Sequence, residues 1–134
     1  MKEHPVMFSF VNYDGYKFVR GLVRHLLQDV LKDQYYAMEV AVNEAVNNAI
    51  EFGTHGKKIY LGFRVKRRKL IVRVNGHGLG FDVKTMLKNS LSREDPFLQL
   101  NMSERGRGIL LIMAAADYVC YNRQGTEILM IKEI

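Results

Sequence analysis

A glutamate and an asparagine, Glu44 and Asn48, stand four residues apart in the segment EVAVNEAVNNAIEFG. If this segment is a helix, the two side chains project from the same face. A carboxylate there can accept a proton, and an amide oxygen can ligate a hard cation such as Mg²⁺. The same face carries Ala37 and Ala41, whose small side chains leave room for a ligand. The pair therefore predicts either a site, with Glu44 as base and Asn48 as metal ligand, or the exposed polar edge of a helix.

Three glycines, Gly76, Gly78 and Gly80, follow directly on a predicted buried strand in the segment GHGLGF. Glycine adopts positive φ without strain and lets the backbone approach a ligand closely. The spacing is neither the dinucleotide fingerprint nor a phosphate loop with a Lys-Ser/Thr pair. Two interpretations stay open, a ligand-contacting loop and a plain turn from strand to helix.

Arginines and glycines alternate where an apolar helix is predicted to begin, in the segment SERGRGILLI. They are Arg105, Gly106, Arg107 and Gly108. The free N–H groups and the dipole at a helix N-terminus favour an anion, and arginines add charge-assisted hydrogen bonds. The alternative is a flexible helix start with solvated arginines. Further on, Thr126 follows Gly125 in QGTEILMI, which by itself indicates an ordinary hairpin turn.

The four motifs in this order resemble the GHKL ATPase superfamily of gyrase, the ninety-kilodalton heat-shock chaperone, histidine kinases and MutL. Within it, the segments NEAVNNAIEFG and ERGRGILLI are similar to the anti-sigma-factor serine/threonine protein kinases of bacteria. The resemblance covers nearly the whole chain, from about Phe8 to Ile131. It implies ATP and Mg²⁺ as cofactors.

The resemblance assigns roles to single residues of the helix motif and the RGRG segment. Glu44 matches the general base, and Asn48 matches the asparagine that coordinates Mg²⁺. Gly106 and Gly108 match the second glycine loop, whose backbone approaches the phosphates.

The resemblance also assigns the adenine pocket. Gly78 and Gly80 match the first glycine loop, which forms part of the pocket and the root of a mobile lid. Thr126 matches a threonine that lies under the adenine. The lid corresponds to the stretch from about Leu87 to Arg105.

Two positions depart from the family pattern. The family motif is D-x-G-x-G, whose aspartate accepts a hydrogen bond from the adenine amino group, and Gly76 occupies the aspartate position. Asn75 lies one residue earlier, and strand alternation directs it to the opposite face. Phe52 stands where many relatives carry histidine. Loss of a charged acceptor in a buried site costs roughly 1.5–3 kcal/mol, which puts adenine recognition in question.

Two function hypotheses follow. The first is an ATP-dependent kinase that phosphorylates a STAS-type anti-sigma antagonist and sequesters a sigma factor. The second is a nucleotide-independent regulatory module on the same fold, favoured by Gly76. A homodimer is a further expectation, and the basic flank of the first helix, Lys17, Arg20 and Arg24, is expected to meet an acidic partner.

The periodicity of apolar residues predicts the elements that position these motifs. Asp14 is the expected N-cap of the first helix, and the second is expected to end at Gly53. The expected strands are Val6–Val11, Ile59–Val65, Leu70–Val74, Tyr118–Asn122 and Glu127–Ile131, and the expected helices are Tyr16–Val30, Gln34–Phe52, a short one near Val83–Leu87, and Ile109–Ala116. This order predicts an α+β fold, a two-layer sandwich of one mixed, mostly antiparallel sheet covered on one face by helices.

Composition limits the remaining function classes. The 134 residues are 48% hydrophobic and 25% charged, which predicts one ordinary globular domain spanning residues 1–134. Cys120 is the single cysteine, and the four histidines show no metal-ligand spacing with it, so we expect neither an internal disulfide nor a zinc site. The lone cysteine favours a reducing, cytoplasmic location, and the segment MKEHPVMFSF does not resemble a secretory signal. The longest apolar stretch, Ile109–Ala116, is far shorter than the ~20 residues that cross a bilayer. The net charge of +6 and the KRRK run weakly suggest that the protein binds nucleic acid. The favoured interpretation of KRRK is a basic hairpin turn exposed to solvent.

Overall fold

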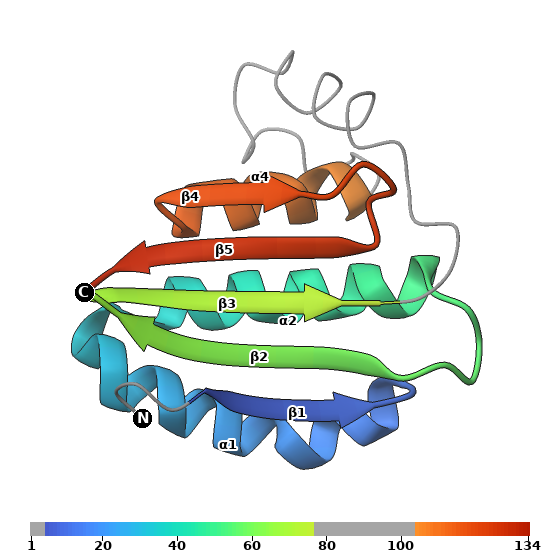
Figure 1. Cartoon of the computed structure of the whole chain (residues 1–134), viewed down its shortest axis with the longest axis horizontal. Helices are drawn as coiled ribbons and strands as arrows, with labels where there is room; N and C mark the ends of the chain where they lie inside the picture. Colours follow the sequence, from blue (N-terminus) through green and yellow to red (C-terminus); the bar gives the residue numbers. More distant parts are fainter. Residues whose placement is uncertain (1–4, 77–103) are drawn as a thin grey trace.

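The computed structural model describes residues 5–76 and 104–134 (Figure 1). Its elements, in chain order, are β1 (Val6–Phe10), α1 (Tyr13–Leu31), the 3₁₀ turn η1 (Lys32–Gln34), α2 (Tyr35–Phe52), β2 (Ile59–Lys66), β3 (Lys69–Asn75), α4 (Glu104–Ala115), β4 (Tyr118–Tyr121) and β5 (Glu127–Glu133). The predicted short helix near 83–87 lies outside the described residues.

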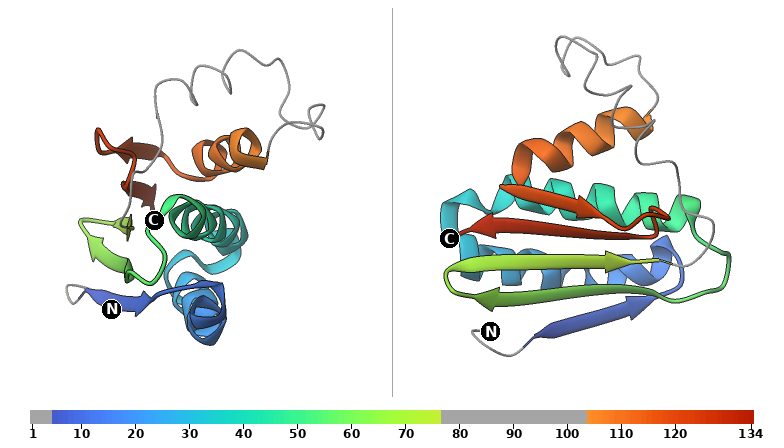
Figure 2. Two further views of the ribbon diagram at one scale, coloured as in Figure 1. Left: turned by 90° about the vertical axis from the view of Figure 1, so that its right-hand side faces the viewer. Right: turned by 45° about the horizontal axis from the view of Figure 1, so that its top comes forward.

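The described strands form one sheet in the order β1-β2-β3-β5-β4. The described helices cover one of its faces and leave the other open (Figure 2, left). This confirms the predicted α+β fold with helices on one face. All four neighbouring pairs are antiparallel, so the described sheet is not the mixed sheet that we expected.

The core lies between the covered face of the sheet and α2. Alternate residues of β2, β3 and β5, such as Phe63, Val72 and Met130, point into it and are fully buried. Met38 and Val46 of α2 pack against them. Burying each such side chain contributes roughly 1.5–3 kcal/mol, which fixes α2 on the sheet.

Asn12, rather than Asp14, caps α1, because the helix begins three residues earlier than predicted. The Asn12 Oδ1 atom accepts a hydrogen bond from the Gly15 N–H at 2.9 Å. Asp14 lies in the first helical turn, where its negative charge faces the positive end of the helix dipole.

Two polar contacts hold α1 against α2. Arg24 donates from Nε to Oε2 of Glu39 at 2.6 Å, and the hydrogen bond raises the pKa of the Arg24 guanidinium. Tyr16 donates from its hydroxyl to Oδ1 of Asn43 at 2.5 Å, and burial raises the pKa of Tyr16 to about 12. The expected basic flank of α1 is thus partly engaged within the molecule.

The turn between β2 and β3 carries backbone strain. Arg67 and Arg68 both have positive φ, 51° and 62°, in the two-residue turn that joins the hairpin. Such a turn favours Asn-Gly, because other residues lose free energy in the left-handed region.

We therefore expect Arg67→Asn/Arg68→Gly to raise the free energy of unfolding by about 1–2 kcal/mol. Urea unfolding measures it. The matched control, Arg67→Gln/Arg68→Gln, removes the same charges and keeps the strain, so its stability should stay near that of the parent. If both variants gained the same free energy of unfolding, the gain would come from removing the charges, and the strain argument would be wrong.

Candidate functional site

The predicted base and the predicted glycine of α4 lie against each other. A Cβ atom placed on Gly108 would lie 2.7 Å from Oε2 of Glu44, a distance that real Cβ contacts do not reach. Only glycine leaves the Glu44 carboxylate in its present position against α4. Two motifs 64 residues apart in the chain are thus brought into contact by the packing of α2 on α4.

The RGRG segment belongs to α4 itself. The helix begins at Glu104, so Arg105, Gly106 and Arg107 lie in its first turn, and Gly108 follows as a buried residue. The first N–H groups of a helix have no partner within it and can bind an anion.

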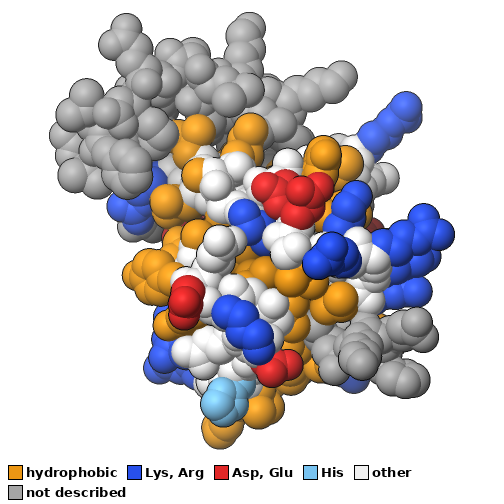
Figure 3. Space-filling view, turned by 90° about the vertical axis from the view of Figure 1, so that its left-hand side faces the viewer, with side chains coloured by type: hydrophobic (Ala, Val, Ile, Leu, Met, Phe, Trp, Pro, Cys, Tyr) orange, Lys and Arg blue, Asp and Glu red, His pale blue; other side chains and the backbone are white. Residues whose placement is uncertain are grey.

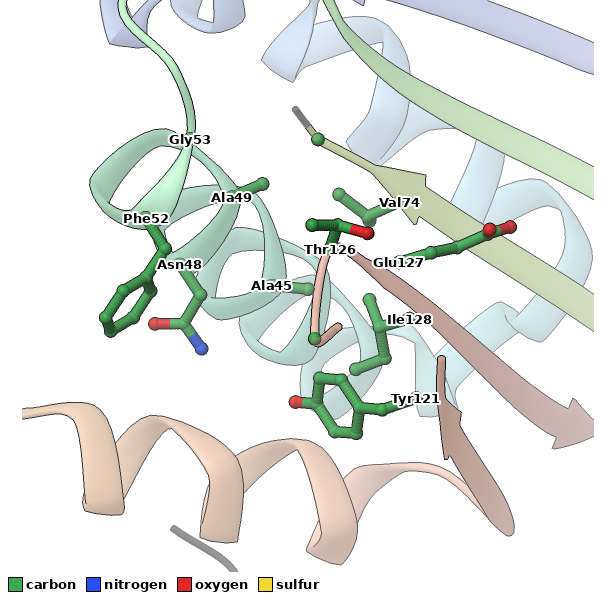
Figure 4. Close-up of a pocket in the computed structure, with 12 residues that line it drawn as sticks. Ala45, Asn48, Ala49, Phe52, Gly53, Val74, Tyr121, Thr126, Glu127 and Ile128 are labelled. Carbon is green, nitrogen blue, oxygen red and sulfur yellow. The ribbon is translucent and has the colours of Figure 1, made fainter. Parts of the chain in front are cut away.

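Asn48 lies one helical turn from Glu44 on α2 and is 9% exposed. Its side chain extends from α2 toward α4 (Figure 4). Within residues 5–76 and 104–134, no hydrogen bond to the Asn48 side chain is formed. Asn48 lines an open pocket, so its amide oxygen is placed where a ligand can reach it.

Gly76 and Thr126 also come together, as the resemblance implies. The Gly76 N–H donates to the Thr126 carbonyl oxygen at 2.8 Å, which extends the β3–β5 ladder by one bond. The two residues line a pocket with Asn48, completed by the α2 and β4–β5 side chains drawn in Figure 4. Phe52 lines it too.

The pocket is narrow. Its empty space is about 360 Å³ out to the open mouth, but only about 20 Å³ can hold the centre of a water molecule. Burial raises the pKa of the Tyr121 phenol in its wall above its ordinary value.

A second cavity, on the other side of the α2 C-terminus, is wider: about 330 Å³ of it can hold the centre of a water molecule, against about 20 Å³ in the first pocket. It is lined by the β1–α1 connection and the segment after α2, including Asp14, His55 and Lys57. None of the predicted site residues lines it.

Asn122 is a positioning residue that the sequence analysis missed. Its Oδ1 accepts from the Thr126 N–H at 2.9 Å, and its Nδ2 donates to Thr126 Oγ1 at 2.8 Å. These bonds fix the threonine at the pocket wall. The available signal was an asparagine before a Gly-containing turn, where its side chain often bonds the backbone.

Gly76, which the resemblance aligns with the adenine-binding aspartate, has little room for a side chain. A Cβ atom on Gly76 would meet Cβ of Ala49 at 3.3 Å, so the end of β3 runs close to α2. Asn75 pairs regularly with Tyr60 and Glu127, which keeps it on the opposite face from Val74, as predicted. Asn75 therefore does not replace the missing aspartate in the pocket.

We expect Gly76→Asp to tighten adenine-nucleotide binding by about tenfold to a hundredfold, because a charged acceptor contributes roughly 1.5–3 kcal/mol. The crowding at Ala49 should lower stability by about 1 kcal/mol. Isothermal titration with ATP and GTP measures the gain. Gly76→Asn is the matched control, since it crowds Ala49 equally without a charge. Equal affinities for Gly76→Asp and Gly76→Asn would count against an adenine contact at this position.

The remaining predicted site residues, Gly78 and Gly80, lie outside the described residues, as does most of the predicted lid at 87–105. Within the described part of the chain, no group of three or more His, Cys, Asp or Glu side chains could hold a metal ion. No described helix combines the length and apolarity needed to cross a membrane.

The comparison with known families agrees with this arrangement. The model of the histidine kinase-like ATPase domain matches residues 17–132. The chain belongs to the histidine kinase-like ATPase family. The matched residues run from α1 to β5, so they include every residue of the candidate site.

Among solved structures, this ATPase-type domain is similar to the histidine kinase AdeS of Acinetobacter baumannii. The identity is 16% and the TM-score 0.46, and the match covers 98% of this chain and 66% of that chain. No curated protein matches the sequence.

Proposed function

We propose that this domain binds Mg²⁺–ATP and acts as an anti-sigma-factor serine/threonine protein kinase. Its substrate would be a STAS-type antagonist protein, and it would sequester a sigma factor in the cytoplasm. Family membership supports nucleotide binding. The similarity of NEAVNNAIEFG and ERGRGILLI to anti-sigma kinases supports the finer assignment. The observation that carries the proposal is the contact of Glu44 with Gly108, one helical turn from the buried amide of Asn48.

The described residues fit a bound Mg²⁺–nucleotide. Asn48 offers an amide oxygen in the pocket lining, and the start of α4 offers N–H groups for phosphate oxygens. Gly76 and Thr126 form the pocket wall on the base side. When bound, Mg²⁺–ATP supplies the phosphoryl group and a cation that neutralises charge on it.

The chain's own residues act by positioning and by proton transfer. Glu44 would take the proton from the substrate serine hydroxyl as the serine oxygen bonds to the γ-phosphorus of ATP and ADP leaves, and Gly108 leaves room for the Glu44 carboxylate. Asn48 would hold Mg²⁺, and the N–H groups at the α4 N-terminus would stabilise the negative charge of the phosphates.

The alternative, a nucleotide-independent binding module, has its own support. Gly76 stands in place of the adenine-binding aspartate, and the pocket is narrow. Such a module would bind its partners with the same affinity whether nucleotide is present or absent.

Phosphoryl transfer tests the proposal. The purified domain is mixed with radiolabelled ATP, Mg²⁺ and a STAS-type protein, and label on the substrate serine is followed. A serine-to-alanine substrate is the control. Label on the serine supports the kinase. Tight, nucleotide-independent binding of a sigma factor without transfer would replace the kinase by the binding module. A homodimer remains a prediction, which sedimentation of the same sample tests.

A further inference from the structure

The face of the sheet that no described helix covers presents an apolar centre bordered by cations. One row across four strands consists of Arg64, Ile71, Ile131 and Tyr118, paired in register. Their inward neighbours Val72 and Met130 are buried, so this row points away from the helices. Ile71 and Ile131 are half-buried, whereas Tyr118 is 59% exposed. The open face is turned to the viewer in Figure 1.

The cations lie at one end of this face. The basic border consists of Arg64, Lys66, Arg67, Arg68 and Lys69, all of them exposed. Figure 3 looks onto this end of the molecule and shows Lys and Arg side chains gathered on the sheet side. Lys69 lies 5.9 Å above the Tyr118 ring, which links the border to the apolar row.

Few carboxylates balance the border. The ion pairs of the described residues involve Arg24, Arg73 and Lys132, and none involves a member of the border. Glu133, opposite Lys69 in the register, is the acidic residue paired with it across the strands. Arg67 and Arg68 adopt positive φ, which costs stability, at this exposed turn. Strained residues of this kind are more often kept for function than for stability, which favours a binding role for the two arginines.

We infer that the basic border and the row Ile71–Ile131–Tyr118 form a docking surface for an acidic protein segment that also carries aliphatic side chains. Arginine and tyrosine around an apolar centre are the composition of protein–protein contact sites. The cations pair with the carboxylates of the segment, and its aliphatic side chains cover the two isoleucines. This surface lies apart from the nucleotide pocket, so the inference does not depend on the kinase proposal.

Other occupants fit the surface less well. A second copy of the chain would bring the same cation-rich face and no matching acidic surface, and like-charge repulsion opposes any arrangement with the two borders adjacent. Nucleic acid would place phosphates over the two isoleucines, which offer no hydrogen bonds. A membrane requires apolar side chains that project beyond the surface, whereas both isoleucines are half-buried.

The test uses the whole chain and a short fluorescent peptide of glutamate and leucine. Polyglutamate, duplex DNA, and vesicles of phosphatidylcholine and phosphatidylserine are the competing probes. We expect the peptide to bind best and its affinity to fall with salt. In amide spectra of the labelled protein, shifts should gather at the β2–β3 turn, β5 and β4.

Two charge-removing variants and one control locate the surface. Arg67→Asn/Arg68→Gly and Arg67→Gln/Arg68→Gln should both weaken peptide binding by about three- to tenfold, although only the first relieves turn strain. Lys57→Gln/Lys58→Gln removes the same charge from the loop before β2 and should leave the affinity unchanged. Equal loss in all three variants, shifts outside the open face, or tighter binding of polyglutamate, DNA or vesicles would overturn the inference.

Discussion

Replacing Glu44 by glutamine is expected to abolish phosphoryl transfer while nucleotide binding persists. Glutamine keeps the shape of the side chain packed on Gly108, but it cannot accept a proton at neutral pH. A general base supplies about 10²–10⁴-fold in rate, and its loss appears in turnover rather than in affinity. Turnover with a STAS-type substrate and calorimetric binding of Mg²⁺–ATP measure the two effects separately.

Glu51→Gln provides the control for this substitution. Glu51 is an exposed glutamate on the same helix, so its replacement makes the same chemical change away from Gly108. Its turnover should match that of the parent. Full transfer by Glu44→Gln would remove this residue from the proposed mechanism.

Gly108→Ala is expected to lower turnover by about a hundredfold without unfolding the protein. The new methyl group would meet Oε2 of Glu44 at 2.7 Å, so the carboxylate must move away. The cost to the fold is small, because a flexible side chain can move more readily than the helix backbone. Alanine also has a helix propensity about 1 kcal/mol better than glycine. Stability should therefore hold or rise as activity falls.

Gly21→Ala separates these two effects. Gly21 lies on an exposed face of α1, and a Cβ atom placed there meets nothing within 4 Å. This variant gains the same helix propensity without disturbing Glu44, so we expect equal or higher stability with full turnover. If Gly108→Ala kept full turnover, the contact between α4 and Glu44 would have no role in the proposed chemistry.

Local patterns predicted the elements well. The spacing of apolar residues predicted α2, including its end at Phe52. The alternation of apolar and polar residues predicted the hairpin of β2 and β3. The first cap was misassigned because Asn12 and Asp14 are both good capping residues, and sequence alone does not decide between them.

Contacts between segments far apart in the sequence could not be predicted from local patterns. No local signal tells that β5 lies between β3 and β4, and this order is what joins Gly76 to Thr126. The resemblance grouped Glu44 and Gly108 in one site, but their direct contact depends on how closely α2 and α4 pack. The narrowness of the pocket likewise follows from side-chain packing that no motif encodes.

Calorimetric titration of the whole chain with Mg²⁺–ATP tests the central claim, that the pocket lined by α2, the end of β3 and the β4–β5 hairpin binds this nucleotide. The account predicts binding that needs Mg²⁺ and that weakens in Asn48→Ala, together with a gain of about 2.7 kcal/mol in stability at a hundredfold excess over Kd. No heat and no stabilisation at saturating concentrations, in a sample that is fully folded, would contradict it.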